Sequence, residues 1–307
     1  MKGLLSAAVS AAAMLAAVPV SAETLRVNGI YPAGNDSAVL LDSIAIEPFG
    51  GEDGGSLSIR VEDALRAAQV DGEAWFRILP GSLSTDAEAA LRGTVVTRID
   101  RESAGDKEVK RCVERDEKRK CVREIKNRVP CMRTVVRVSP SLRLIDREGA
   151  LMHADDSTVE RSERFCADDN RPDSEAMVDS AIDEIASRVR YELAPTQRSE
   201  AIRVLESRKG MDKALGRQFR DAIRQTKVDE PGACESFAAL EPGIGAHESL
   251  LFNMGLCAEA AGDLDTAETY YNRAIALDGS SSHAEAGLRR IGDRRVALRQ
   301  LSEKYGG

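Results

Sequence analysis

The ten residues from Cys112 to Cys121 read CVERDEKRKC, so two cysteines enclose seven charged side chains and one valine. The flanking segments EVKRCVE and KCVREIK are expected to be the strands of a long β-hairpin, with this polar stretch as its tip. A zinc site would instead need close pairs such as C-x2-C with histidines nearby, and the sequence has neither. We therefore interpret CVERDEKRKC as a hairpin tip stapled by a disulfide.

The other cysteines also suggest local pairing. Residues that face each other in a regular antiparallel hairpin have a constant sum of residue numbers, so a cysteine pair should straddle its own turn. The midpoint of Cys112 and Cys121 falls in the polar tip, and that of Cys131 and Cys166 falls in REGA, where Gly149 can adopt a positive φ. The last two cysteines are expected on neighbouring antiparallel helices. The predicted disulfides are Cys112–Cys121, Cys131–Cys166 and Cys234–Cys257.

The first residues have the form of a secretory signal peptide. Lys2 precedes an uninterrupted run of small and apolar residues, and Val20 and Ala22 fit a small-residue cleavage site. We expect residues 1–22 to be removed and the mature chain to be exported to the periplasm, where an even number of cysteines favours disulfides. No cysteine follows the cleavage site to carry a lipid anchor, and no later apolar stretch is long enough for a transmembrane helix.

Residues 43–195 alternate between strand and helix patterns, as in an α/β sheet. The helix that follows the glycine-rich loop GGEDGG has an apolar stripe, and a later helix begins at an N-cap, Asp173 or Ser174, and ends at Pro195. We place a domain boundary there. The expected order is strand SIAIEPF, helix LSIRVEDALRAA, strand WFRILPG, short helix STDAEAAL, strand RGTVVTRI, β-hairpins and helix VDSAIDEIASRV, preceded by an extension at residues 23–42.

This order resembles the α/β domain shared by the TolB amino-terminal region, the curli-transport CsgG family and the outer-membrane activators of penicillin-binding proteins. The resemblance rests on IAIEPF, the amphipathic helix after the glycine-rich loop and ALRGTV, and it spans about Ser43 to Leu193. It implies a cell-envelope protein that binds other proteins. The stapled hairpins are additions to that pattern, and the chain lacks the lipidated cysteine that several of those proteins carry.

Residues 196–307 are expected to be helical throughout, beginning with helices near 199–208 and 211–226. The stretch ESLLFNMGLCAEAAGDLDTAETYYNRAIALDG, aligned on Gly255, resembles a tetratricopeptide repeat. The resemblance implies two helices that approach closely at small residues, with a capping helix after them. The positions expected to pack these helices together are Leu251, Gly255, Ala267, Tyr271 and Ala274, and a degenerate earlier unit would use Ala233, Phe237 and Leu240.

The same resemblance implies a concave face formed by first helices, where Asn253 and Glu259 are the candidate partner-binding residues. The expected fold class is thus α+β, an α/β-type sheet with extended, disulfide-stapled β-hairpins, followed by an all-α domain like tetratricopeptide repeats.

Charge is distributed unevenly along the chain. Lys107 to Arg147 contains 14 Lys or Arg and 6 Asp or Glu, whereas the whole chain has a net charge of −8. This excess can mark an anion-binding face, although strand residues that merely point their charges into water would give the same composition. We expect no nucleic-acid partner, because the exported chain is acidic overall and this stretch has no aromatic residues for stacking. The candidate anion-binding residues, in the hairpin 107–128, are Lys110, Arg111, Lys118, Arg119 and Lys120.

No grouping of catalytic residues stands out. The loop FGGEDGGS lacks the G-K-[ST] ending of a phosphate loop, there is no G-x-S-x-G elbow, and each cysteine has an expected structural partner. His153, His247 and His283 are isolated, so we expect no metal or cofactor. A secreted hydrolase with an unrecognised pair of carboxylates stays open as an alternative, because carboxylates are abundant.

The sequence therefore favours a non-enzymatic periplasmic scaffold or adaptor that binds other cell-envelope proteins through both domains. The alternatives are a module that binds an anionic ligand or envelope polymer through the basic hairpin, and the hydrolase.

Overall fold

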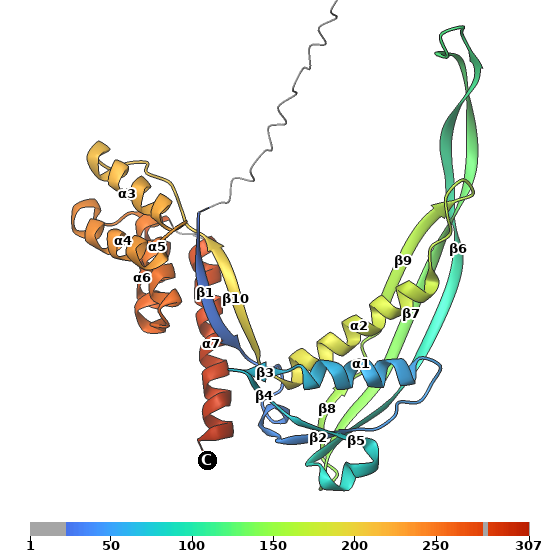
Figure 1. Ribbon diagram of the computed structural model, residues 1–307, viewed down its shortest axis with the longest axis horizontal. Helices are drawn as coiled ribbons and strands as arrows, with labels where there is room; N and C mark the ends of the chain where they lie inside the picture. The colour runs from blue at the N-terminus through green and yellow to red at the C-terminus, as the bar shows by residue number, and fades with distance from the viewer. Residues whose placement is uncertain (1–22, 279–281, 307) are drawn as a thin grey trace, which may run out of the picture. The chain divides into compact units, whose positions relative to one another are not determined.

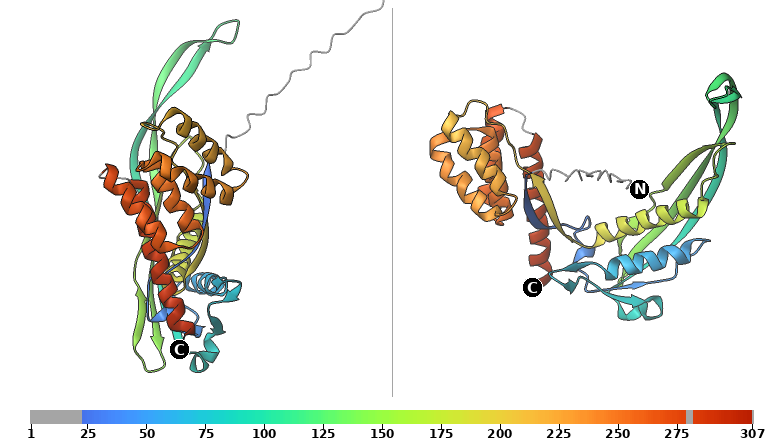
Figure 2. Two further views of the ribbon diagram at one scale, coloured as in Figure 1. Left: turned by 90° about the vertical axis from the view of Figure 1, so that its left-hand side faces the viewer. Right: turned by 45° about the horizontal axis from the view of Figure 1, so that its top comes forward.

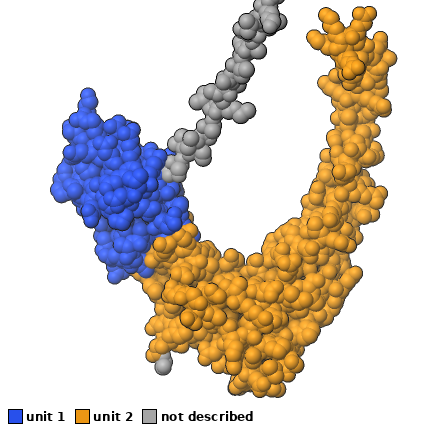
Figure 3. All heavy atoms as spheres, viewed as in Figure 1, with its two compact units in different colours: residues 1–27, 200–287 blue, residues 28–199, 288–307 orange. Residues whose placement is uncertain are grey.

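The computed structural model describes residues 23–278 and 282–306, so the expected signal peptide lies outside the described residues. Contacts within the chain divide it into two compact units (Figure 3). Unit 1 comprises residues 200–287 and the described chain before Asn28, whereas unit 2 comprises residues 28–199 and 288–307. This division differs from a boundary at Pro195, since the chain passes between the units within three elements. These are β1 (Thr24–Tyr31), β10 (Thr196–Arg203) and α7 (Ser282–Tyr305).

Unit 2 is built on a six-stranded sheet in the order β5-β2-β6-β7-β8, with β9 paired to β7. Strand β2 runs parallel to β5 and β6, whereas β7 is antiparallel to β6, β8 and β9. The α+β class is confirmed. The strands are β2 (Ser43–Ile46), β5 (Arg77–Pro80), β6 (Ala89–Arg115), β7 (Cys121–Asp146), β8 (Leu151–Asp155) and β9 (Val159–Cys166).

Two helices, α1 (Gly54–Arg66) and α2 (Ser174–Leu193), pack on each other and lie along one face of this sheet (Figure 1). Both carry the apolar stripe that the sequence indicates, and these side chains are buried in one core with the inward residues of the sheet. The carboxylate of Asp173 accepts hydrogen bonds from the backbone N–H groups of Glu175 (3.0 Å) and Ala176 (3.2 Å). This N-cap confirms the predicted start of α2.

Two other local predictions for unit 2 need correction. The segment STDAEAAL is no α-helix: a 3-10 helix, η2 (Gly81–Asp86), precedes it and overlaps its start, and β6 begins at Ala89. Parallel pairing of Ala89 and Leu91 with β2 overrides the helix propensity of the alanines. A further small hairpin, β3 (Gln69–Val70) and β4 (Glu73–Ala74), turns at Asp71 and Gly72, both with positive φ.

The expected helix near 199–208 is also wrong. Residues up to Arg203 belong to β10, which pairs with β1 in a two-stranded sheet. Strand β1 lies in the extension at residues 23–42, for which no element was expected. A local sequence pattern does not reveal this strand pair, because its two halves are far apart in the chain.

Unit 1 consists mainly of four consecutive helices, each packed against the next. The packing positions Leu251, Ala267, Tyr271 and Ala274 are all buried. A Cβ atom on Gly255 would lie 2.7 Å from two ring carbons of Tyr271, so only glycine permits this approach of the helices. The helices are α3 (Lys213–Gln225), α4 (Glu230–Ile244), α5 (Glu248–Ala260) and α6 (Leu264–Asp278).

The disulfides join the three predicted pairs, Cys112–Cys121, Cys131–Cys166 and Cys234–Cys257. Cys131 and Cys166 are opposite one another in the β7–β9 ladder, as the constant sum requires. The tip pair does not follow this rule, because Cys112 lies opposite Glu124 and Cys121 lies opposite Arg115. The pairs along the ribbon, such as Lys110 with Lys126, centre on Lys118 and not on the midpoint of the two cysteines.

Candidate interaction surface

Strands β6 and β7 continue past the last residue of β9 as a two-stranded ribbon, residues 104–130, which we call the arm (Figures 1 and 2). Within the described residues no other strand pairs with the arm, and most of its side chains are exposed. A two-stranded hairpin without a covering element has little stability of its own in water. Burial in the core of unit 2 therefore does not explain why the arm is folded.

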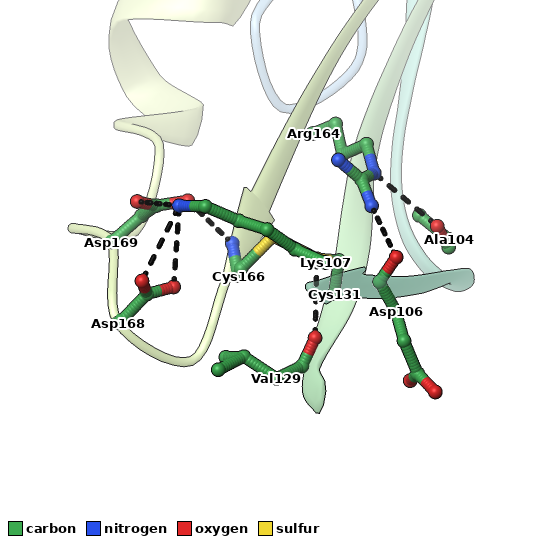
Figure 4. The surroundings of a disulfide bond; sticks show 9 residues. All are labelled: Ala104, Asp106, Lys107, Val129, Cys131, Arg164, Cys166, Asp168 and Asp169. Atoms are coloured by element: carbon green, nitrogen blue, oxygen red, sulfur yellow. Dashed lines mark hydrogen bonds and ion pairs between the residues drawn. A yellow bond between two sulfur atoms is a disulfide. The ribbon is translucent and has the colours of Figure 1, made fainter. Parts of the chain in front are cut away.

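The base of the arm is held by polar contacts (Figure 4). The Lys107 ammonium lies 3.3 Å from a carboxylate oxygen of Asp168 and 3.2 Å from one of Asp169. Asp169 also accepts a hydrogen bond of 2.9 Å from the Cys166 backbone N–H. This amide, and then the Lys107 ammonium, hold the pKa of Asp169 below its ordinary value. On the other side, the Arg164 guanidinium donates to the Ala104 carbonyl at 3.2 Å.

Cys166, Asp168 and Asp169 lie close enough together to be considered as metal ligands. The Cys166 sulfur is bonded to Cys131, however, and both carboxylates face the Lys107 ammonium. A disulfide sulfur is not a thiolate ligand, and the Lys107 ammonium already occupies the place between the two carboxylates, so a cation is not expected to bind here. We therefore treat this cluster as a clamp on the arm.

The two faces of the arm differ in character. Val109 and Arg111 lie opposite Asn127 and Ile125, so these four side chains share one face. The other face carries charged pairs, with Glu108 opposite Arg128 and Lys110 opposite Lys126. Three apolar side chains towards the tip are exposed, Val113 by 40%, Val122 by 59% and Ile125 by 39%. Exposed aliphatic groups therefore lie among the cations towards the tip of the arm.

Part of the arm's positive charge is neutralised by its own carboxylates. Lys126 pairs with Glu108 at 2.9 Å and Arg123 with Glu114 at 3.0 Å. The five residues predicted to bind anions are all exposed, and in the described part of the chain none of them forms an ion pair. They are Lys110, Arg111, Lys118, Arg119 and Lys120. The arm thus carries three of these cations at its tip and two further down on opposite faces, and their charge is available to an external anion.

The turn at the tip has a defined conformation. One oxygen of the Asp116 carboxylate accepts hydrogen bonds from the backbone N–H groups of Lys118 (2.9 Å) and Lys120 (2.8 Å). Arg119 has a φ of 62°, a left-handed conformation that costs an arginine roughly 1 kcal/mol relative to glycine. The Arg115 guanidinium donates to the Arg119 carbonyl at 2.9 Å. The turn therefore holds Arg119, a third cation beside Lys118 and Lys120, at a position where glycine would be less strained.

The prediction that Asn253 and Glu259 bind a partner is wrong, because both side chains are fully buried. The Asn253 amide accepts from the Leu205 N–H (2.8 Å) and donates to the Leu205 carbonyl (3.0 Å). Glu259 accepts a hydrogen bond of 2.6 Å from the Tyr271 hydroxyl. The strand that was expected to be a helix leads into Leu205, and its extended continuation covers this face of α5. These residues hold unit 1 together.

Sequence reasoning missed the clamp at Lys107, Asp168 and Asp169, and the exposed valines of the tip. The acidic pair two residues after Cys166 was a usable signal for the clamp, since a disulfide between β7 and β9 brings that segment to the base of the hairpin. The exposure of Val113 and Val122 could not be predicted from the sequence, because it depends on how far β9 extends along the ribbon.

No helix of the described residues is both long and apolar enough to cross a membrane. No family model matches the chain, and no curated protein matches it. Among solved structures, a PelC dodecamer variant from Paraburkholderia phytofirmans is 14% identical, covers 54% of this chain and 97% of its own, and has a TM-score of 0.24. A second PelC dodecamer from the same organism is 13% identical, covers 56% and 98%, and has a TM-score of 0.23. These scores are too low to support an argument about fold or function.

Proposed function

We propose that this protein is a non-enzymatic adaptor of the cell envelope, exported to the periplasm, which binds another envelope protein through the arm. The observation that carries the proposal is the arm itself, a ribbon of 27 paired or turning residues with exposed valines and cations and no covering element within the described chain. A surface of this kind is costly to keep in water and becomes useful when a partner covers it.

The disulfides support the proposed compartment. The structure joins six cysteines in three pairs, which is typical of a chain that folds in an oxidising environment. In this proposal the signal peptide directs export, and the staple at Cys112–Cys121 limits the conformations of the tip before a partner binds.

Unit 1 serves as the second, scaffolding part of the adaptor. The contact between Gly255 and Tyr271 supports the proposed likeness to a tetratricopeptide repeat, because it brings two helices together at a small residue. The buried amide and carboxylate on α5 remove the partner surface first expected there. We therefore assign recognition to the arm and keep unit 1 as a folded body.

A second candidate function is binding of an anionic envelope polymer. It is favoured by the five arm cations that form no ion pair with the described residues. Binding to such a polymer would fall steeply as salt increases and would not need the exposed valines. Titration with poly-glutamate at two salt concentrations separates this function from protein binding, which would keep its dependence on Val113 and Val122.

The proposal is tested by shortening the arm. Residues 107–129 are replaced by an Asn-Gly turn, which leaves the disulfide Cys131–Cys166 in place, and crosslinked complexes are captured from intact cells. We expect one envelope protein to be captured with the full chain and lost with the shortened chain, while the melting temperature of the two chains stays the same. Capture of the same protein by both chains would refute a role of the arm.

A further inference from the structure

A small pocket in unit 1 is lined by three arginines. Its volume is about 200 Å³, and Arg208, Arg220 and Arg224 line it together with Ile223, Glu23 and Glu206. Two of the arginines come from α3, where positions four residues apart lie on the same face of the helix. The third comes from the segment between β10 and α3 and packs over Gly216, one turn before Arg220. We call this site the arginine pocket.

The acidic residues of the pocket have cationic partners other than these three arginines. Glu23 pairs with Lys227 at 3.0 Å, and this hydrogen bond lowers the pKa of Glu23. Glu206 pairs with Arg203 at 2.8 Å. Both carboxylates are thus neutralised by Lys227 and Arg203, and they do not balance the three arginines that line the pocket.

The arginines themselves are weakly paired. The nearest carboxylate to Arg220 and Arg224 is that of Asp221, at 3.7 Å and 3.9 Å, and the two share it. The Nε atom of Arg220 is buried and has no hydrogen-bond partner in the described part of the protein. The Arg220 side chain as a whole is 41% exposed, however, so its outer N–H groups are open to an acceptor from outside the protein.

We propose that the arginine pocket binds the oxyanion group of a small molecule, a carboxylate or a phosphate. Guanidinium groups present parallel N–H donors that match two oxygens of such a group, which a compact ammonium cannot do. The outer N–H groups of Arg220 supply donors to the anion, while Arg208 and Arg224 add positive charge. This site is separate from the arm and does not depend on the proposed function.

The experiment is calorimetric titration of the full mature chain with inorganic phosphate and, separately, with acetate. We expect saturable binding of at least one anion, weakened about tenfold by R220Q, since one charge-assisted hydrogen bond accounts for a change of that size. R220K should also weaken binding, because it keeps the charge and removes the planar donors. Tighter binding of phosphate would assign a phosphoryl group, and tighter binding of acetate a carboxylate.

The matched control is R217Q, which removes an exposed arginine from the same helix that does not line the pocket. It should leave the affinity unchanged. Two results would overturn the proposal: no saturable heat with either anion, or an equal loss of affinity in R217Q and R220Q, which would indicate only general attraction by a basic helix. Circular dichroism of each variant verifies that α3 stays folded, so that a loss of binding can be assigned to the pocket.

Discussion

The arm and the helical hairpin α5–α6 are built on the same plan, two antiparallel elements joined by a short turn. The disulfide of the arm joins its two strands, whereas that of the helical hairpin joins α5 to the preceding helix α4. The two hairpins differ in how far their side chains are buried. In the helical hairpin Tyr271 is fully buried against Gly255, and even Asn253 and Glu259 point inward. In the arm the side chains of both faces reach water. The helical hairpin is thus stabilised by its own burial, whereas the arm depends on a polar clamp and a staple.

This contrast separates two roles for disulfides in one chain. Cys131–Cys166 is buried and joins two strands of the main sheet, whereas Cys112–Cys121 lies in the exposed tip. The first ties the arm to a packed core, and the second restricts a segment that has no core. Breaking Cys131–Cys166 should therefore lower the global stability of unit 2. Breaking Cys112–Cys121 should have only a local effect in the tip.

A large effect on unit 1 is expected from replacing Gly255 with alanine. The new Cβ would overlap the Tyr271 ring, so G255A should lower the free energy of unfolding of unit 1 by about 1–3 kcal/mol. Thermal denaturation followed by circular dichroism measures the change. The control is G292A in α7, where a Cβ meets no atom within 4 Å, and which should stabilise the protein by roughly 0.5–1 kcal/mol. Equal effects at both glycines would contradict the close approach at Tyr271.

The second effect compares the disulfides. Replacing Cys131 and Cys166 with serine should destabilise unit 2 by about 2–4 kcal/mol, because the pair closes a long loop within the core. Replacing Cys112 and Cys121 should leave the unfolding midpoint of unit 2 unchanged and increase hydrogen exchange only in the tip. If the tip pair shifted the midpoint as much as the core pair, the arm would be part of the cooperative core.

The third effect concerns the clamp and pH. Because the pKa of Asp169 is held below 3.8, its contribution to the clamp is present above that pH and is lost as the pH falls through the lowered value. The Cys166 amide, which donates to Asp169, should keep its protection against hydrogen exchange at neutral pH and lose it only as the pH falls below 3.8, after correction for intrinsic rates. In D169N this loss should be present already at neutral pH.

The smallest effect is expected at the tip. Arg119→Gly should slow exchange of the Lys120 amide several-fold, because glycine adopts the positive φ without strain worth about 1 kcal/mol. The control Lys118→Gly, at a position without positive φ, should speed exchange instead. Faster exchange in both variants would show that the left-handed Arg119 is unstrained.

Much of the fold could be predicted from the sequence, because many of its helices and strands have short-range sequence patterns. The apolar stripes of α1 and α2 are local signals with a fixed period, and Cys131 and Cys166 share the midpoint of their turn. The β1–β10 pair could not be predicted, since its two strands lie far apart in the chain and each finds its partner only in the folded protein. That omission produced the error at Asn253, because the segment after β10 occupies the face where a partner was expected.

The candidate surface was predicted only in part. The five cations were visible as a charge excess, and the structure leaves them without ion partners in the described chain. Their neighbours Val113 and Val122 could not be assigned, because a valine in a predicted hairpin is ordinarily on its buried side. This ribbon has no buried side because β9 ends at Cys166, and that end becomes evident only in the structure.

Site-specific photocrosslinking in living cells tests the central claim most directly. A photoreactive residue is placed at Val122 in the arm or, as a control, at Leu277 on α6, two apolar positions that are 59% and 48% exposed. The account predicts one discrete crosslinked envelope protein from Val122, absent from Leu277 and lost when Lys118, Arg119 and Lys120 are replaced with glutamate. No product from Val122, or the same product from both positions, would contradict recognition by the arm.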